Sequence, residues 1–441
     1  MKMPIVIRSL LLTLLLFLPA TSSPAEAAGA LTLQDAIRES LEGNPSTGME
    51  RQKLRQLEAD YRAARAGLLP HLSATASYTR LAPDRLAMTS QPGTALYEGE
   101  AYGGIGLSQL LFDGKTNALR KVAATAAGAQ EAQVASAENL AAYQAAKAFI
   151  QVLESRALQQ ASLQAVERAR SFEAMTTAYF NAGKVTRLDL LQARSGGLAA
   201  EASLVRAKEL AETGMALLAA VIGRETVDFT VDGRLPAAVP PVPPDSMALV
   251  AAMVRNPDMQ RFRKLSDRAG YTADAAKGAL YPTITAKAGI GYRDRDIGGG
   301  AREWTAGLQL DLPIYDGGAL RAGISRADAA LAESREAERS VRLAVQSQLR
   351  RELSAWRTAA ADLRSAEESI AAARESLDAS QALYRVGKAT SLDILTAQLD
   401  LSRAESERAG ALAGYAIARA GVDLLIGSSR SFTLNSKGGT P

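Results

Sequence analysis

The chain contains its own pattern twice, and this duplication limits the possible folds more than any other feature. Asn44-Pro45 returns 212 residues later as Asn256-Pro257. The most specific match is GKVTRLDLL at 183–191 against GKATSLDIL at 387–395, which lie 204 residues apart. Solenoid repeats have periods of about 20 to 50 residues, so two copies of about 200 residues predict a duplicated domain.

The duplication and its flanks predict how the chain is divided. Lys2 and Arg8, the apolar run 10–18 and the small residues around Ala25-Glu26-Ala27 are typical of a secretory signal peptide. The prolines after Leu235 predict an extended linker. We therefore expect a signal peptide at 1–28, a first repeat at 29–234, a linker at 235–244, a second repeat at 245–428 and a flexible tail at 429–441.

Each copy is expected to contain a helix, a strand, a loop, a strand, a long helix, a turn and a second long helix. Residues 116–180 and 318–426 contain no proline, and a helix of about 65 residues would be about 98 Å long. The second copy also has a column of large residues at seven-residue spacing, which indicates a seam packed against a neighbouring helix. This column contains Leu349, Trp356, Leu363, Ile370, Leu377 and Tyr384.

The predicted strands have one apolar and one polar face. In 283–292 and 304–312 apolar side chains alternate with Thr, Gly and other polar residues. This alternation fits a transmembrane barrel, and it fits a half-buried soluble sheet equally well. Four strands per chain cannot close a barrel, because the practical minimum is about eight strands. A membrane location therefore requires several copies to build one barrel.

Composition excludes most chemistry. The sequence has no cysteine and one histidine, His71, so disulfides, a lipid-modified cysteine and multi-histidine metal sites are excluded. No Gly-rich phosphate loop followed by Lys-Ser/Thr is present. The net charge of +4 is spread along helices of mixed sign. We expect no enzyme activity, cofactor, metal or nucleic-acid partner.

Taken together, these marks resemble the TolC-like outer membrane efflux protein family. The marks are the signal peptide, the duplicated strand pair and helix pair, the Asn-Pro dipeptides, Phe112-Asp113-Gly114 with Tyr315-Asp316-Gly317, and the matched segments at 183–191 and 387–395. The resemblance covers nearly the whole mature chain. It implies an α+β membrane protein whose four strands per subunit contribute to a trimeric twelve-stranded barrel, which continues into a periplasmic tube of twelve helices. The outward loops would then lie at 80–100 and 293–302.

The resemblance also implies partners. The subunit would be a homotrimeric exit duct in outer-membrane lipid, part of a tripartite efflux or type I secretion system. A periplasmic adaptor would dock at the helical tips and connect the duct to an inner-membrane pump. In such families the tip contacts the adaptor. The resemblance therefore assigns adaptor contact to Ala182, Gly183, Val185, Val386, Gly387 and Ala389. Both glycines are also explained as helix ends, because glycine adopts the left-handed conformation at low cost.

Two aspartates next to these turns have two interpretations. Thr186 with Asp189, and Thr390 with Asp393, fit the capping box that begins a helix. In the resembled channels an aspartate at this point forms the closed periplasmic constriction. Six carboxylates in a trimer would raise one another's pKa or recruit cations. Ala389 stands where the family has an arginine partner, and Thr396 where a second aspartate follows, so we expect a weaker or differently held closed state.

Two alternatives have a different architecture. A periplasmic adaptor also carries a signal peptide and a long helical hairpin, but it normally has one hairpin and no second strand pair. A soluble coiled-coil scaffold would leave the apolar strand faces unexplained. The transported substrate and the class of pump are not specified by the sequence.

Overall fold

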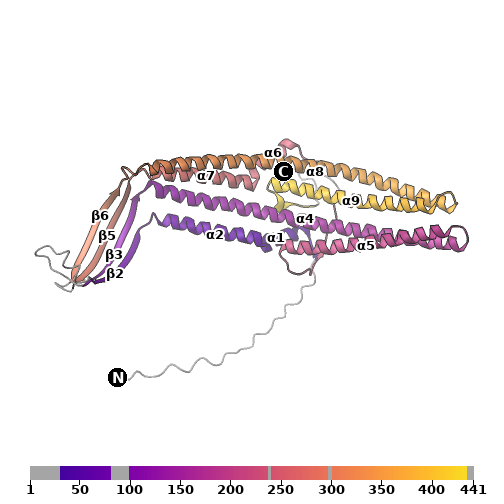
Figure 1. Ribbon diagram of the computed structural model, residues 1–441, viewed down its shortest axis with the longest axis horizontal. Helices are drawn as coiled ribbons and strands as arrows, with labels where there is room; N and C mark the ends of the chain where they lie inside the picture. Colours follow the sequence, from indigo (N-terminus) through magenta and orange to yellow (C-terminus); the bar gives the residue numbers. More distant parts are fainter. Residues whose placement is uncertain (1–29, 81–98, 237–239, 296–299, 435–441) are drawn as a thin grey trace, which may run out of the picture.

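The protein is an elongated molecule with a sheet at one end and two helical hairpins at the other (Figure 1). The computed structural model describes residues 30–80, 99–236, 240–295 and 300–434. The expected signal peptide and most of the expected tail and first outward loop lie outside these ranges.

The order of elements in the first half recurs in the second. The first half contains α1 (Leu33–Gly43), α2 (Pro45–Ala66), β2 (His71–Arg80), β3 (Gly99–Phe112), α4 (Gly114–Asn181) and α5 (Arg187–Ile222). The second contains α6 (Asp245–Arg255), α7 (Pro257–Gly278), β5 (Thr283–Arg295), β6 (Ala301–Asp311), α8 (Ala319–Arg385) and α9 (Ser391–Leu425). Two short strands, β1 (Ala30–Leu31) and β4 (Thr230–Val231), pair in parallel, and a 3₁₀ turn, η1 (Ser429–Ser431), follows α9.

The expected long helices are present and begin at clear signals. α4 has 68 residues and α8 has 67, which corresponds to about 100 Å each. The Asp113 carboxylate accepts from the Lys115 backbone and caps α4. Asn44 and Asn256 cap α2 and α7, whose first residue is a proline with no amide to leave unpaired.

The four long strands form one antiparallel sheet in the order β2-β3-β5-β6. β3 and β5 join the two halves, with Ile105 opposite Ile290. Within the described ranges, β2 and β6 are the edges of this sheet. One face carries exposed large apolar side chains, among them Ile290, Trp304, Leu308 and Leu310.

The strands extend further than the sequence indicated. Arg80 lies in β2, Glu100 in β3, Arg293 in β5 and Arg302 in β6, so the expected loops 80–100 and 293–302 were too wide. Arg293 pairs with Glu100 and Glu303, and these cross-strand ion pairs continue the sheet beyond its apolar segments. His71 is the first residue of β2 and is exposed, with Nδ1 2.8 Å from the Leu69 carbonyl oxygen.

Three buried clusters lie along the helices. The first joins α1, β1 and β4 to α4, α5 and α9, and includes Phe149 and Leu218. The second joins α6 and α7 to α8 and α9 around Trp356 and Tyr415. The third lies toward the hairpin turns around Tyr384 and Ile394. All six residues of the predicted seven-residue column in α8 are buried, which confirms that this stripe is packing.

The two halves are joined side by side. α2 packs on α4, and α7 packs on α8 in the equivalent way. α4 also packs against α7 and α9 of the second half, and Figure 1 shows α4 running beside both.

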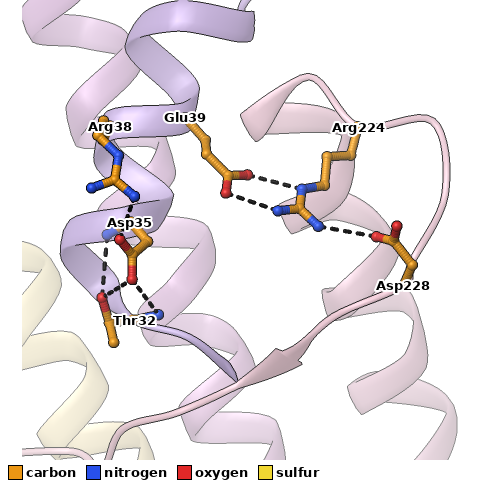
Figure 2. Close-up of polar contacts among 6 residues, drawn as sticks. All are labelled: Thr32, Asp35, Arg38, Glu39, Arg224 and Asp228. Carbon is orange, nitrogen blue, oxygen red and sulfur yellow. Dashed lines mark hydrogen bonds and ion pairs between the residues drawn. The ribbon is translucent and has the colours of Figure 1, made fainter. Parts of the chain in front are cut away.

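Figure 2 shows how α1 is fixed to the end of α5. The Arg224 guanidinium donates to both carboxylate oxygens of Glu39, at 2.9 and 2.8 Å, and to Asp228 at 3.0 Å. Thr32 and Asp35 form a capping box at the start of α1.

No helix in the described ranges is both long and apolar enough to cross a membrane.

Candidate functional site at the helical tips

The two hairpin turns lie at the end of the molecule farthest from the sheet (Figure 1). Gly183 has φ +69° and Gly387 has φ +71°, so both adopt the left-handed conformation. After α4, the Lys184 amide donates to the Tyr179 carbonyl at 2.9 Å and Gly183 to Phe180 at 2.9 Å. Lys388 and Gly387 repeat both bonds after α8. This is the Schellman motif, which accounts for glycine at both positions.

The predicted capping boxes are present at both turns. The Thr186 amide donates to Asp189 Oδ2 at 2.8 Å, and the Asp189 amide donates to the Thr186 hydroxyl at 3.3 Å. Thr390 and Asp393 make the same pair of bonds at 2.7 and 3.3 Å. Both aspartates therefore satisfy amides that a helix start would otherwise leave unpaired.

The six residues assigned to adaptor contact fall into two groups. Ala182, Gly183, Val386 and Gly387 are exposed, and Val386 is 67% accessible. Val185 and Ala389 are half-buried and pack against the cluster around Tyr384. The first four form the outward surface of the tips, whereas the other two also hold the turns onto the helices.

The two aspartates differ in one contact that the sequence did not indicate. Ser391, the first residue of α9, is buried, and its hydroxyl lies 2.6 Å from Asp189 Oδ1 and 2.7 Å from Gln192 Oε1. Asp189 thus contacts the other hairpin. Asp393 is exposed and, in the described part of the chain, only its Oδ2 has a partner.

Hydrogen bonds set the protonation of both carboxyls. The bond from Ser391, followed by that from Thr186, lowers the pKa of Asp189. Bonds from the Thr390 backbone and side chain lower the pKa of Asp393. Within one chain both groups therefore favour the charged form.

An aromatic cluster supports the turns. The Tyr384 ring lies 5.7 Å from Phe172 and 6.1 Å from Tyr179, so α8 packs on α4 just behind the tip. Burial raises the pKa of Tyr384. The position of Tyr384 in the seven-residue column predicted its burial, but its partners on α4 required the tertiary structure.

At the other end of the molecule, charged side chains connect three strands. Glu100 of β3 accepts from Arg293 and Arg295 of β5, and Arg293 also donates to Glu303 of β6 at 2.9 Å. The Arg293 guanidinium lies 5.0 Å from the centre of the Tyr102 ring. These residues alternate with the apolar face, so the sheet has one apolar and one polar side.

The described ranges contain no group of three or more His, Asp or Glu side chains placed to hold a metal ion. The polar groups at the tips are instead engaged in caps and helix-to-helix contacts.

Comparison with known proteins gives a consistent result over nearly the whole chain. The family model for the outer membrane efflux protein matches residues 36–224 and 248–428. The outer membrane efflux protein BepC of Brucella suis biovar 1 (strain 1330) is 29% identical over 420 residues, which cover 91% of this chain and 88% of that protein.

Solved structures share the fold. A membrane protein from Pseudomonas aeruginosa superposes with a TM-score of 0.80 at 21% identity, covering 92% of both chains. The outer membrane protein VceC from Vibrio cholerae gives 0.78 at 20% identity, covering 90% of this chain and 96% of that one.

Proposed function

The chain belongs to the outer membrane efflux protein family and is an outer-membrane channel subunit of an efflux system, and from this premise we propose that it works as a homotrimeric exit duct. Three copies would pair their sheets, β6 of one with β2 of the next, into a barrel of twelve strands. The apolar face of the sheet would contact lipid and the face with Arg293 and Glu100 would line the lumen.

The observation that carries this proposal is the incomplete sheet. Among the described residues, β2 and β6 have no strand partner on their outer edges, and open edges are not tolerated in lipid. The same sheet exposes Trp304 and Leu308, 78% and 74% accessible, on one face. Pairing with further copies satisfies the edges, and lipid covers the apolar face.

The helical tips would receive a periplasmic adaptor that leads to an inner-membrane pump. Ala182, Gly183, Val386 and Gly387 supply the exposed contact surface, with Val185 and Ala389 beneath it. Asp189 and Asp393 would narrow the lumen at the same level. The division into a signal peptide at 1–28, repeats at 29–234 and 245–428, a linker at 235–244 and a tail at 429–441 is part of this proposal, as are export and the absence of a lipid anchor.

Two valines of matched exposure test the docking surface. Val386 at the second tip is 67% accessible and Val250 on α6 is 65% accessible. In a strain that depends on this channel for efflux, we expect Val386→Asp to abolish resistance to exported compounds, because a charge would be buried in an apolar contact. Val250→Asp should retain resistance.

Native mass spectrometry of both variants in detergent provides the control, since both must remain trimeric at wild-type abundance. A monomeric wild-type protein would contradict the exit duct itself. Full resistance with Val386→Asp, in a trimer of normal abundance, would contradict docking at the tips.

A further inference from the structure

A groove between the two repeats lies beside the start of the linker. α9 packs against both α8 and α4, and Figure 1 shows it between them. The groove has a volume of about 960 Å³ and is lined by residues within 153–164 of α4, 367–374 of α8, 405–412 of α9 and the segment 233–236. Sites for organic ligands typically have volumes of about 300 to 1,000 Å³, so the groove is large enough for an organic molecule.

The lining is charged where it is exposed and apolar where it is buried. Leu153, Ile370 and Leu412 are at most 8% accessible and form an apolar base. Positive charges exceed negative charges by two, because four arginines and two glutamates line the groove. The arginines are Arg156, Arg234, Arg374 and Arg408, and the glutamates are Glu367 and Glu405.

An ion pair of the first repeat is opened in the second, which makes one of these arginines available. In the first repeat, Arg170 lies 2.8 Å from Glu201. The equivalent residues 204 positions later are Arg374 and Glu405, whose charged atoms are 4.0 Å apart, beyond hydrogen-bond distance. Glu405 instead accepts a hydrogen bond from Arg168 of α4 at 3.0 Å. The Arg374 side chain is 65% accessible and can bind a ligand.

Two further arginines of the lining are free. Arg234 and Arg408 are exposed, and in the described part of the chain neither makes an ion pair or a side-chain hydrogen bond. The packing of the hairpin does not require a charge at position 408, because the equivalent residue of the first repeat is Leu204. Arg408 is therefore specific to the junction that contains the groove.

The fourth arginine fixes the wall of the groove. Arg156 donates a hydrogen bond to the Val231 carbonyl of β4, which holds the following segment 233–236 against α4. A guanidinium has five N–H donors, so Arg156 keeps donors for a second partner. The equivalent residue in the second repeat is Ala360, so this arginine is also specific to the junction.

We propose that this groove binds an organic anion that carries two negatively charged groups on an apolar body. Sulfonate, carboxylate and phosphate groups all suit the arginines, because a guanidinium can donate two parallel hydrogen bonds to one oxyanion. The buried leucines and Ile370 contact the apolar body. The groove is formed by one chain, so the proposal does not depend on ring assembly, and a bound anion contacts both repeats.

Isothermal titration calorimetry of the purified full-length protein in a non-ionic detergent tests the site. The probe is naphthalene-2,6-disulfonate, a rigid dianion whose charges lie at opposite ends of an apolar body. We expect one molecule to bind per chain, with an affinity that falls as the salt concentration rises. The absence of binding by the wild-type protein at low salt would overturn the proposal and leave the exit duct untouched.

Two substitutions on α9 locate the site. Arg408→Leu introduces the residue of the first repeat and should weaken binding about tenfold, because one charged hydrogen-bond donor is lost. Arg403→Leu removes an exposed arginine that pairs with Glu407 and does not line the groove, so it should bind the probe as wild type does. Circular dichroism shows that both variants are folded. Equal affinities for the two variants would overturn the assignment of the groove as the site.

Two related anions test the class of ligand. Pyrophosphate has the charge without the apolar body, and naphthalene-2-sulfonate has the apolar body with one charge. Each should bind at least tenfold more weakly than the disulfonate. Pyrophosphate of equal affinity would overturn the role of the apolar base, and monosulfonate of equal affinity would overturn the requirement for two charged groups.

Discussion

The two halves of the molecule have the same fold but hold their short first helices differently. α1 and α6 share two buried positions: Ala36 corresponds to Ala248 and Ser40 to Ala252, 212 residues later, and all four are buried. Their outer faces differ. Asp35, Arg38 and Glu42 on α1 become Met247, Val250 and Val254 on α6, which are at least 60% accessible.

The ends of the hairpins show the same contrast. Arg224, which ties α1 to the end of α5, corresponds to Ser428, which bonds to Asp423 within its own segment. The two shared buried positions keep small residues in both halves because packing allows few substitutes. Surface positions have diverged because a surface change usually costs less than about 0.5 kcal/mol. The difference predicts unequal responses to matched substitutions.

The largest difference is expected at the two Asn-Pro caps. Asn256 is buried, its amide donates to the Leu425 carbonyl at 2.9 Å, and its oxygen accepts from the Met259 amide at 3.0 Å. Asn44 is half-buried and its amide lies 3.4 Å from the Val221 carbonyl. Asn256→Ala should lower the free energy of unfolding by about 2 to 3 kcal/mol, and Asn44→Ala by about 1 kcal/mol.

Denaturant unfolding of the purified protein, followed by circular dichroism, measures both losses. The larger loss is expected for Asn256→Ala because the buried Leu425 carbonyl at the end of α9 is left without its hydrogen-bond donor. Equal losses at the two sites would show that burial of the cap does not matter.

A smaller effect is expected at the ion pair that only the first half possesses. Arg224→Ser introduces the residue found in the second half and should lower the free energy of unfolding by about 1 kcal/mol, because the two hydrogen bonds from the guanidinium to the Glu39 carboxylate are lost. The loss is small because about a third of each side chain is exposed to solvent. Repeating the unfolding measurement in 1 M salt should shrink the difference from wild type. Arg38→Ser, which breaks only the exposed pair with Asp35, is the control and should change little. A loss that persists unchanged in salt would indicate packing of the arginine stem instead.

The smallest effect concerns a half-buried carboxyl on α4. Burial raises the pKa of Glu154 above its ordinary value of 4.5, and the second half has Thr358 at the equivalent position. A raised pKa means that the folded state favours the protonated form. Its contribution to stability is fully present below pH 4.5 and is lost as the pH rises through the folded-state pKa.

Glu154→Gln should therefore unfold at a higher temperature than wild type at pH 7, and the advantage should disappear as the pH approaches 4.5. Thermal unfolding across this pH range checks the prediction, with the exposed Glu58→Gln on α2 as control. A constant offset between Glu154→Gln and wild type at every pH would contradict the proposed titration.

Much of the architecture followed from local signals in the sequence. Proline-free stretches indicated the long helices, and the capping boxes at Thr186 and Thr390 indicated where α5 and α9 begin, because a cap satisfies amides within its own turn. Gly183 and Gly387 marked where they end, because only a residue without a Cβ enters the left-handed conformation cheaply. The alternation in 283–292 and 304–312 identified two strands, although cross-strand ion pairs extend them past the predicted ends.

The tertiary structure decided what the duplicated signals could not distinguish. The two capping boxes are equivalent in sequence, yet Asp189 meets Ser391 of the other half while Asp393 keeps a free oxygen in the described chain. Likewise, the sequence indicated that Tyr384 is buried, but not that it packs on Phe172 and Tyr179. A repeat contains the information for its own helices and turns. The contacts between the two repeats depend on how the repeats are placed side by side. That placement is set by residues about 200 positions apart in the chain, which meet only when the chain folds.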